Sequence, residues 1–342
     1  MTVERLLDPR GRPRLGRFAG SLQDADGRHD TTPDAFGRQR GRLARQLTYK
    51  QFQYFGGMSR DLIFGCALID LGYASSVFWY VVDARTGERE EQVVRLPGRL
   101  GLSMSASPVS GESRHRSRGL QIVQRYQDAP RSKQLVLEAG DRLFIDAVMP
   151  ESGFEPMSLC TRAGYQGWVY ANKTAGLPLT GTLRWRGETH DLARLGAMGH
   201  HDFSCGYMRR ETWWNWACLS GRAVDADGHA ADLGFNLSCG VNETTWSENC
   251  LWLDGRLLPV SGMVFHFPED DVLQPWTLAS LDGEVSLQFT PLGMHRETLR
   301  ALVLSGHFRQ IFGHFSGTLR AGARHFVIDR LPGFVEDQFV RW

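Results

Sequence analysis

A chain of 342 residues is longer than a single β-barrel or sandwich needs, and it is sufficient for two domains. Hydrophobic residues make up 42% of the chain, as in ordinary globular proteins. The formal net charge of +1 excludes an overall field that would draw the protein to nucleic acid or to an acidic membrane surface.

The N-terminal segment is predicted to be an extended, poorly structured arm. Residues 1–45 are rich in Arg, Gly, Asp and Pro, show no sustained hydrophobic period, and hold ten Arg against six Asp and Glu. This modest excess favours a solvated basic segment over a nucleic-acid-binding arm. The stretch 42–55, RLARQLTYKQFQYF, could begin as a short helix, because Leu43 and Leu47 lie four residues apart.

From about residue 48 onward the pattern predicts β-strands. The stretch 61–70, DLIFGCALID, alternates so that every second side chain shares one face. Residues 75–83 are β-branched and aromatic and end at a turn over 83–87. Residues 134–148 and 181–192 each have the pattern of a strand, a turn and a second strand.

The C-terminal half carries the most regular signal. Asp-Gly pairs at 227–228, 254–255 and 282–283 lie between alternating apolar runs, which is the strongest short-range indication of a β-hairpin. Their even spacing predicts an antiparallel meander, as in an up-and-down barrel. The stretch 295–304, HRETLRALVL, could be helical by propensity, whereas its neighbours favour a strand; both remain open.

Several other classes of protein are disfavoured. The six cysteines form no C-x-x-C pair, which predicts reduced and mostly buried thiols. The first residues, MTVERLLDPRG, lack the apolar region of a secretory signal, and the longest strongly apolar run, 77–82, is too short to span a bilayer. We therefore expect a cytoplasmic protein without an integral membrane segment. Nucleotide-binding glycine motifs are absent from the sequence, and we predict no cofactor.

The stretch 199–221, GHHDFSCGYMRRETWWNWACLSG, is the richest in chemistry. Strand alternation puts Trp214 and Trp216 on one face and Trp213 on the other. Two exposed indoles on one strand would be unusual, so we expect Trp214 and Trp216 to face the interior of a barrel. They are either core residues or the wall of a ligand cavity.

The adjacent His200, His201 and Asp202 resemble metal ligands, but alternation separates them. In a strand, His200 and Asp202 face one side and His201 faces the other. Three consecutive residues rarely bind one metal ion, and the sequence has no second cluster with ligand spacing, so we predict no metal site.

Asp202 is the candidate catalytic residue. A carboxyl group beside Trp214 and Trp216 would be partly desolvated, which favours its protonated form and suits a general acid. Indole faces could then stabilise a developing cation. The alternative is structural: Asp202 accepts backbone N–H groups at a bend before Gly206, or it pairs with Arg209 or Arg210.

Further candidates for ligand binding lie near these residues or carry the same aromatic chemistry. They are His200, Glu248, Trp246, Tyr165 and Trp168. Glu248 lies two residues from Trp246, so the two would share a strand face; it is either a second pocket carboxylate or a rim residue. Lys173 follows Trp168 and its flanking tyrosines Tyr165 and Tyr170. It could reach the pocket, but the rim of the pocket is the favoured position.

A succession of segments resembles one bacterial family. In order they are DLGYASSVFWYVVD, GWVYANKTAGLPLTGTL, GHHDFSCGYMRRETWWNWACLSG, GFNLSCGVNETTWSENCLWLDG, FRQIFGHFSGTL and GFVEDQFVRW. From about residue 48 to 342 this order resembles DUF2804, a family of unknown function. The pattern of Asp202, Gly206 and Trp214-Asn215-Trp216 is in turn distantly similar to the carotenoid 1,2-hydratase and AttH-like group.

The resemblance implies an all-β fold of two consecutive lipocalin-like antiparallel β-barrel domains. We expect an arm over 1–47, a first barrel over 48–192 and a second over 193–342. The wider group includes carotenoid hydratases and fungal cyclases that hold isoprenoid or polyene molecules in an apolar cavity. By motif position, Asp202 corresponds to the acid of the hydratases.

Two functions follow as hypotheses. The first is a cofactor-free hydratase, isomerase or cyclase acting on a hydrophobic isoprenoid, polyene or polyketide, with Asp202 as general acid and Trp214 and Trp216 as the cation-stabilising wall. The second is a non-catalytic lipocalin-like carrier of a lipid or isoprenoid. Both have a hydrophobic small molecule as partner and neither involves nucleic acid. The oligomeric state is left open by the sequence.

Overall fold

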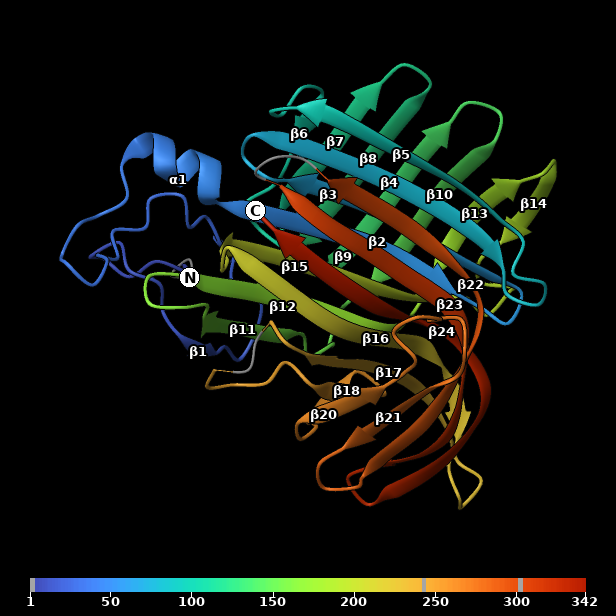
Figure 1. Ribbon diagram of the computed structural model, residues 1–342. Helices are drawn as coiled ribbons and strands as arrows, with labels where there is room; N and C mark the ends of the chain where they lie inside the picture. Colours follow the sequence, from blue (N-terminus) through green and yellow to red (C-terminus); the bar gives the residue numbers. More distant parts are fainter. Residues whose placement is uncertain (1–3, 242–243, 301–303) are drawn as a thin grey trace.

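The computed structural model describes residues 4–241, 244–300 and 304–342. These residues form antiparallel sheets with little helix, so the all-β prediction is confirmed (Figure 1). The short helix α1 (Arg42–Thr48) is present where it was expected and ends before the first long strand. No helix among the described residues is long and apolar enough to cross a membrane.

A central sheet, here called the middle sheet, joins segments that are distant in sequence. Its strands run in the order β1 (Gly16–Arg17), β11 (Met157–Arg162), β12 (Trp168–Pro178), β15 (Met198–Tyr207), β2 (Lys50–Met58), β3 (Leu62–Asp70), β4 (Ala74–Asp83) and β5 (Arg89–Pro97). The strand predicted over 61–70 is therefore β3, and the aromatic run 75–83 is β4.

Two further sheets flank the middle sheet. The N-terminal outer sheet runs β14 (Glu188–Asp191), β13 (Thr180–Trp185), β10 (Leu143–Pro150), β9 (Arg131–Ala139), β8 (Leu120–Asp128), β7 (Gly111–Ser117) and β6 (Leu102–Ser103). The C-terminal sheet runs β19 (Arg256–Pro259), β18 (Cys250–Leu253), β17 (Ala230–Cys239), β16 (Glu211–Val224), β24 (Arg324–Arg341), β23 (Ser305–Ala321), β22 (Val285–Arg300), β21 (Trp276–Ser280) and β20 (Met263–His266).

All three predicted Asp-Gly turns join neighbouring antiparallel strands. They connect β16 to β17, β18 to β19, and β21 to β22, as the meander requires. The ambiguous stretch 295–304 continues β22 as a strand up to Arg300, while residues 301–303 lie outside the described part. Here cross-strand pairing with β23 outweighs local helix propensity.

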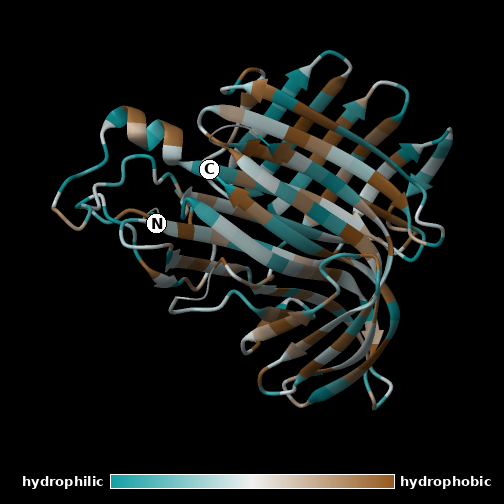
Figure 2. Cartoon of the chain, in the orientation of Figure 1, coloured by the Kyte–Doolittle hydropathy of each residue, from teal (hydrophilic) through white to brown (hydrophobic). Residues whose placement is uncertain are grey.

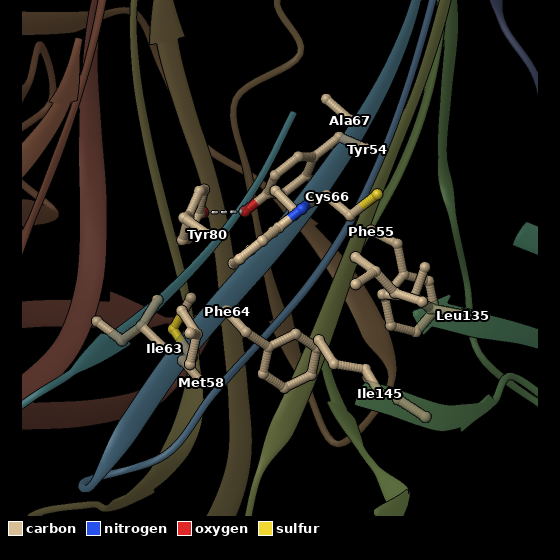
Figure 3. Packing of buried hydrophobic residues seen from close by; sticks show 14 of the residues in the cluster. Tyr54, Phe55, Met58, Ile63, Phe64, Cys66, Ala67, Tyr80, Leu135 and Ile145 are labelled. Carbon is tan, nitrogen blue, oxygen red and sulfur yellow. Dashed lines mark hydrogen bonds between the residues drawn. The ribbon is translucent and has the colours of Figure 1, made fainter. Parts of the chain in front are cut away.

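Alternation along the middle sheet gives it two packed faces. Tyr54 of β2 packs against Trp216 and Phe334 of the C-terminal sheet, with ring centroids 6.2 and 6.0 Å apart. The next residue, Phe55, points the other way and joins Leu135 and Ile145 of the N-terminal outer sheet (Figure 3). The middle sheet is therefore a shared layer with buried apolar residues on both faces. Figure 2 shows hydrophobic and hydrophilic residues mixed along its strands.

The division between the two predicted domains at residues 192 and 193 remains a prediction. Strand β15 follows that boundary, yet it pairs with β2 and β12 inside the middle sheet. Residues 198–207, which contain the His-His-Asp run, therefore belong to the sheet of the first domain. The C-terminal sheet, by contrast, curls around a separate apolar core that includes Trp276, Phe289 and Phe315.

The N-terminal arm differs from the expected solvated segment. It is irregular, but Leu6, Leu22 and Ala25 are fully buried against Trp168 and its neighbours on the middle sheet. Asp30, also buried, accepts a hydrogen bond from Trp168 and pairs with Arg40. The sequence did not predict this packing, because a few apolar residues are enough to anchor a segment that lacks a periodic hydrophobic pattern.

Candidate functional site

A cavity of about 260 Å³ lies between the middle sheet and the C-terminal sheet. We expected a pocket inside one barrel, whereas this cavity draws its wall from both sheets. Its polar lining includes Lys173, Asp202, Ser204, Glu248 and Glu336, and its apolar lining includes Phe52, Ile69, Phe78, Val169, Met208, Trp214, Trp216, Phe308, Val340 and Trp342.

The tryptophan run behaves as alternation predicts. Trp214 and Trp216 of β16 both line the cavity, while Trp213, which precedes Trp214, is 50% exposed. Each cavity indole is held by its own N–H group: Trp214 donates to Glu336 at 2.9 Å and Trp216 donates to Asn236 at 2.6 Å. These bonds fix the ring orientations and leave apolar surface facing the cavity.

Lys173 is the cationic centre of the polar end. It lies on β12 directly opposite Asp202 of β15, so the two side chains share a face. Its Nζ is 3.5 Å from Asp202 Oδ2, 3.0 Å from Glu248 Oε1, and 4.4 Å from the ring centroid of Trp216. Burial lowers the pKa of Lys173, but the charges of Asp202 and Glu248 outweigh it and raise the pKa above its ordinary value. Lys173 is therefore a buried permanent cation, not the rim residue we expected.

Asp202 shares the cavity with the tryptophans but not as an isolated acid. Burial raises the pKa of Asp202 above its ordinary value. Lys173 and the hydroxyl of Ser204, which donates to Oδ1 at 2.7 Å, lower the pKa without cancelling that rise. The alternative role, in which Asp202 pins a bend before Gly206 or pairs with a nearby arginine, does not match these contacts. Strand β15 runs unbroken through Gly206, and the partners of Asp202 are Lys173 and Ser204.

Glu336 of β24 is a second buried carboxyl group on the cavity. Trp214 Nε1 donates to its Oε2, and Gln310 Nε2 donates to its Oε1 at 2.7 Å. Burial raises the pKa of Glu336 to about 7, although the Trp214 hydrogen bond and the Lys173 charge lower it. A carboxyl group with this pKa can both give and take a proton near neutral pH.

The histidine pair is divided between the two faces of the middle sheet, as predicted. His200 Nε2 lies 3.2 Å from the hydroxyl of Tyr54, which itself lies 2.5 Å from that of Tyr80. His201 faces the opposite way, against Tyr126 of the N-terminal outer sheet. Burial lowers the pKa of His200 to about 3, so its ring is neutral at ordinary pH.

One side of the cavity is closed by a polar contact between the two sheets. His295 of β22 stacks on Phe78 of β4 at 5.0 Å, and its Nδ1 lies 2.8 Å from Glu91 of β5. Its Nε2 lies 3.3 Å from Glu297, which pairs with Arg95 of β5. Burial lowers the pKa of His295, but the hydrogen bonds with Glu297 and Glu91 outweigh it and raise the pKa to about 8.

A possible metal-binding group lies elsewhere. Among the described residues, Asp225, Asp227 and His229 bring their ligand atoms within 4.8 Å of one another in the β16–β17 turn. Asp225 there already accepts a hydrogen bond from Arg324 at 2.6 Å. None of these residues lines the cavity, and the expectation of no metal stays a prediction.

Comparison with known proteins agrees with this architecture. A family model described as "domain of unknown function (DUF2804)" matches residues 4–342. This chain belongs to the DUF2804 family. None of the curated proteins compared with the DUF2804 chain matches it significantly.

Solved structures resemble this DUF2804 chain in fold. An AttH-like protein from Nitrosomonas europaea is 14% identical with a TM-score of 0.52, covering 84% of this chain and 92% of that chain. CghA crystallised with Sch210972 is 10% identical with a TM-score of 0.57, covering 99% of this chain and 97% of that one. CghA alone gives a TM-score of 0.55 at 10% identity, covering 99% and 96%. At these identities the likeness shows a shared lipocalin-like fold.

The predicted ligand-binding residues of this DUF2804 protein fall into two groups. Glu248, Trp214 and Trp216 line the cavity together with Asp202, whereas His200 lies beside it behind Tyr54. The others lie outside the cavity wall: Trp246 is half-buried near Gly16, Tyr165 is 68% exposed, and Trp168 packs beneath the N-terminal arm. Aromatic content alone could not separate cavity wall from core or surface.

Sequence reasoning missed Glu336 in this DUF2804 chain and misplaced Lys173. The terminal motif GFVEDQFVRW contains a detectable signal, because strand alternation puts Phe334, Glu336 and Val340 on one face. A single carboxylate among apolar residues on one strand face is a candidate for a buried functional group. Its link to Trp214 could not be found this way, since β16 and β24 are more than a hundred residues apart in sequence.

Proposed function

We propose that this protein is a cofactor-free enzyme of the hydratase, isomerase or cyclase type, acting on a hydrophobic isoprenoid, polyene or polyketide. The observation that carries the proposal is a pair of carboxyl groups on a largely apolar cavity, the buried Glu336 and the partly buried Asp202. The crystallisation of CghA, a protein of similar fold, with Sch210972 supports a ligand-holding role for this architecture.

The two carboxyl groups suit different tasks. Glu336 is held by the neutral donors Trp214 and Gln310 and has a pKa of about 7, so its protonated form can give a proton to an alkene carbon or a carbonyl oxygen. Asp202 lies beside the Lys173 cation, which favours its carboxylate form. We therefore assign proton donation to Glu336 and electrostatic or base function to Asp202, a change from the single acid expected at Asp202.

The indole wall supports the cation that protonation would form. Indole faces favour a nearby positive charge, and the Lys173 ammonium group, 4.4 Å from the ring centroid of Trp216, is one such charge. In a hydration, Glu336 gives a proton to one alkene carbon, water adds its oxygen to the other, and the surplus proton of that water returns to a carboxylate. In an isomerisation or cyclisation, a proton on a neighbouring carbon returns to the carboxylate instead.

A ligand carrier is the second candidate. It is favoured by one observation: Asp202 and Glu336 both have protein hydrogen-bond partners, as structural carboxyl groups do. A carrier would use the same apolar lining and the same indole wall, but it would leave its ligand chemically unchanged.

Activity can be tested without knowing the substrate in advance. The protein is incubated with an apolar metabolite extract of its source in deuterated or ¹⁸O-labelled water, and products are followed by mass spectrometry. Proton donation to carbon should incorporate deuterium, and hydration should also incorporate ¹⁸O. Glu336→Gln should abolish incorporation and Asp202→Asn should lower the rate by about 10²-fold or more.

The exposed carboxyl Glu211 supplies the control, since Glu211→Gln should leave the rate unchanged. Because the acid form of Glu336 is required, the rate should fall as pH rises through about 7. Recovery of one unmodified ligand, with no label incorporated, would instead establish the carrier.

A further inference from the structure

The tip of the N-terminal arm exposes apolar side chains that do not pack into the core. Phe36 is 87% exposed and Leu43 of α1 is 68% exposed, and none of the residues of α1 is buried. Leu47 lies one helical turn beyond Leu43, on the same side of the helix. The arm and α1 project from the sheets beside the C-terminus (Figure 1). We call Phe36, Arg38, Arg42, Leu43 and Leu47 the arm tip.

The loop before α1 is built to present Phe36. The carboxylate of Asp34 accepts hydrogen bonds from the backbone N–H groups of Phe36 and Arg38, at 2.9 and 2.8 Å. Gly37, with φ of +79°, completes this turn in a backbone conformation that favours glycine. A large aromatic ring held outward on a closed turn does not contribute to the stability of this fold.

The arm tip is also locally cationic. Residues 35–48 contain four arginines and no acidic residue, in a chain whose overall net charge is only +1. Arg40 turns inward to Asp30, whereas Arg38 and Arg42 are exposed and form no ion pair within the described residues. Exposed apolar side chains flanked by arginines match an anionic lipid surface, where rings and leucines enter the interface and arginines meet phosphate groups.

The arm tip adjoins the cavity. The Lys50 ammonium group donates to the Leu47 carbonyl at the end of α1 and lies 5.5 Å from the ring centroid of Trp342. Trp342 and Phe52, whose rings are 6.1 Å apart, both line the cavity. A surface bound at the arm tip would therefore lie close to one end of the apolar cavity.

We propose that the arm tip docks the protein on anionic phospholipid bilayers, so that the cavity exchanges its apolar ligand with the membrane. Only the exchange step rests on the proposed function; the docking does not. The local charge and the exposed side chains decide this binding, which is why the near-zero net charge of the chain does not exclude it.

Docking is tested by co-sedimentation with vesicles of phosphatidylcholine alone or with phosphatidylglycerol. The wild-type protein should bind the anionic vesicles and stay in solution with the neutral ones. Phe36→Ser/Leu43→Ser/Leu47→Ser and, separately, Arg38→Gln/Arg42→Gln should each weaken binding about tenfold or more. The matched control Leu281→Ser/Val327→Ser removes two equally exposed apolar residues elsewhere and should bind as wild type does.

The proposal is overturned if wild type does not sediment with anionic vesicles, if it binds neutral vesicles equally well, or if the arm-tip variants bind like the control. All substituted positions are exposed, and near-ultraviolet circular dichroism checks that each variant is folded. The assay contains no ligand and no turnover, so its failure would leave the proposed enzyme untouched, and an inactive enzyme could still dock.

Discussion

At the scale of the residue, Lys173 organises the candidate site. Its ammonium group pairs with the buried carboxylate of Glu248 and the partly buried carboxylate of Asp202, and it lies over the indole ring of Trp216. Buried ions of this kind are costly to desolvate, and each is tolerated because the others are present. The cluster therefore behaves as a unit, and the removal of one member affects the others.

Lys173→Met should destabilise the protein by about 3–5 kcal/mol, because it leaves the buried Glu248 and the partly buried Asp202 without their counter-charge. Chemical denaturation measures the free energy of unfolding. Lys173→Met/Asp202→Asn/Glu248→Gln removes the unpaired charges and should recover a large part of the loss. A triple variant no more stable than Lys173→Met would show that packing of the lysine stem, not charge, holds the cluster.

At the scale of the element, β22 meets β4 and β5 across one side of the cavity. The contact is the stack of His295 on Phe78 and the ionic chain from Glu91 through His295 and Glu297 to Arg95. This contact joins edge regions of two sheets that share no hydrogen-bonded strand pair among the described residues. Protonation of one imidazole therefore contributes to keeping the sheets together.

The contribution of His295 to the free energy of unfolding should depend on pH. Its folded-state pKa of about 8 lies above the ordinary value of 6.5, so the stabilisation is complete below 6.5 and is lost as pH rises through 8. The difference in free energy of unfolding between wild type and His295→Gln should shrink by about 2 kcal/mol from pH 6 to pH 9. A constant His295→Gln difference across this range would contradict the assignment.

At the scale of the whole molecule, the arm and the two barrels form one packed structure. The middle sheet carries the N-terminal outer sheet on one face and the C-terminal sheet on the other, and the arm covers Trp168 at one end. The cavity lies where the middle sheet and the C-terminal sheet meet, and residues of both sheets form its wall. Changes in the arm should therefore affect global stability.

Leu22→Ala should lower the free energy of unfolding by about 2–5 kcal/mol, because it opens a hole in a fully buried cluster. Leu43→Ala, made in the same arm at an exposed position, should change it by less than about 0.5 kcal/mol. Equal effects of the two substitutions would indicate that the arm does not pack as described.

The sequence by itself determined the local features of this protein. Alternation predicted β3 and separated Trp213 from Trp214 and Trp216, because a strand has a two-residue period. A β-branched and aromatic run predicted β4, and the Asp-Gly pairs marked three hairpin turns, because a tight turn needs particular residues. Ordered motifs also indicated the DUF2804 family.

Tertiary structure alone decided which distant strands face each other. The pairing of β15 with β12 set Asp202 opposite Lys173, and that of β16 with β24 brought Trp214 to Glu336. It also decided that the cavity lies between sheets, because desolvation and charge pairing depend on neighbours in space, which a single sequence does not specify.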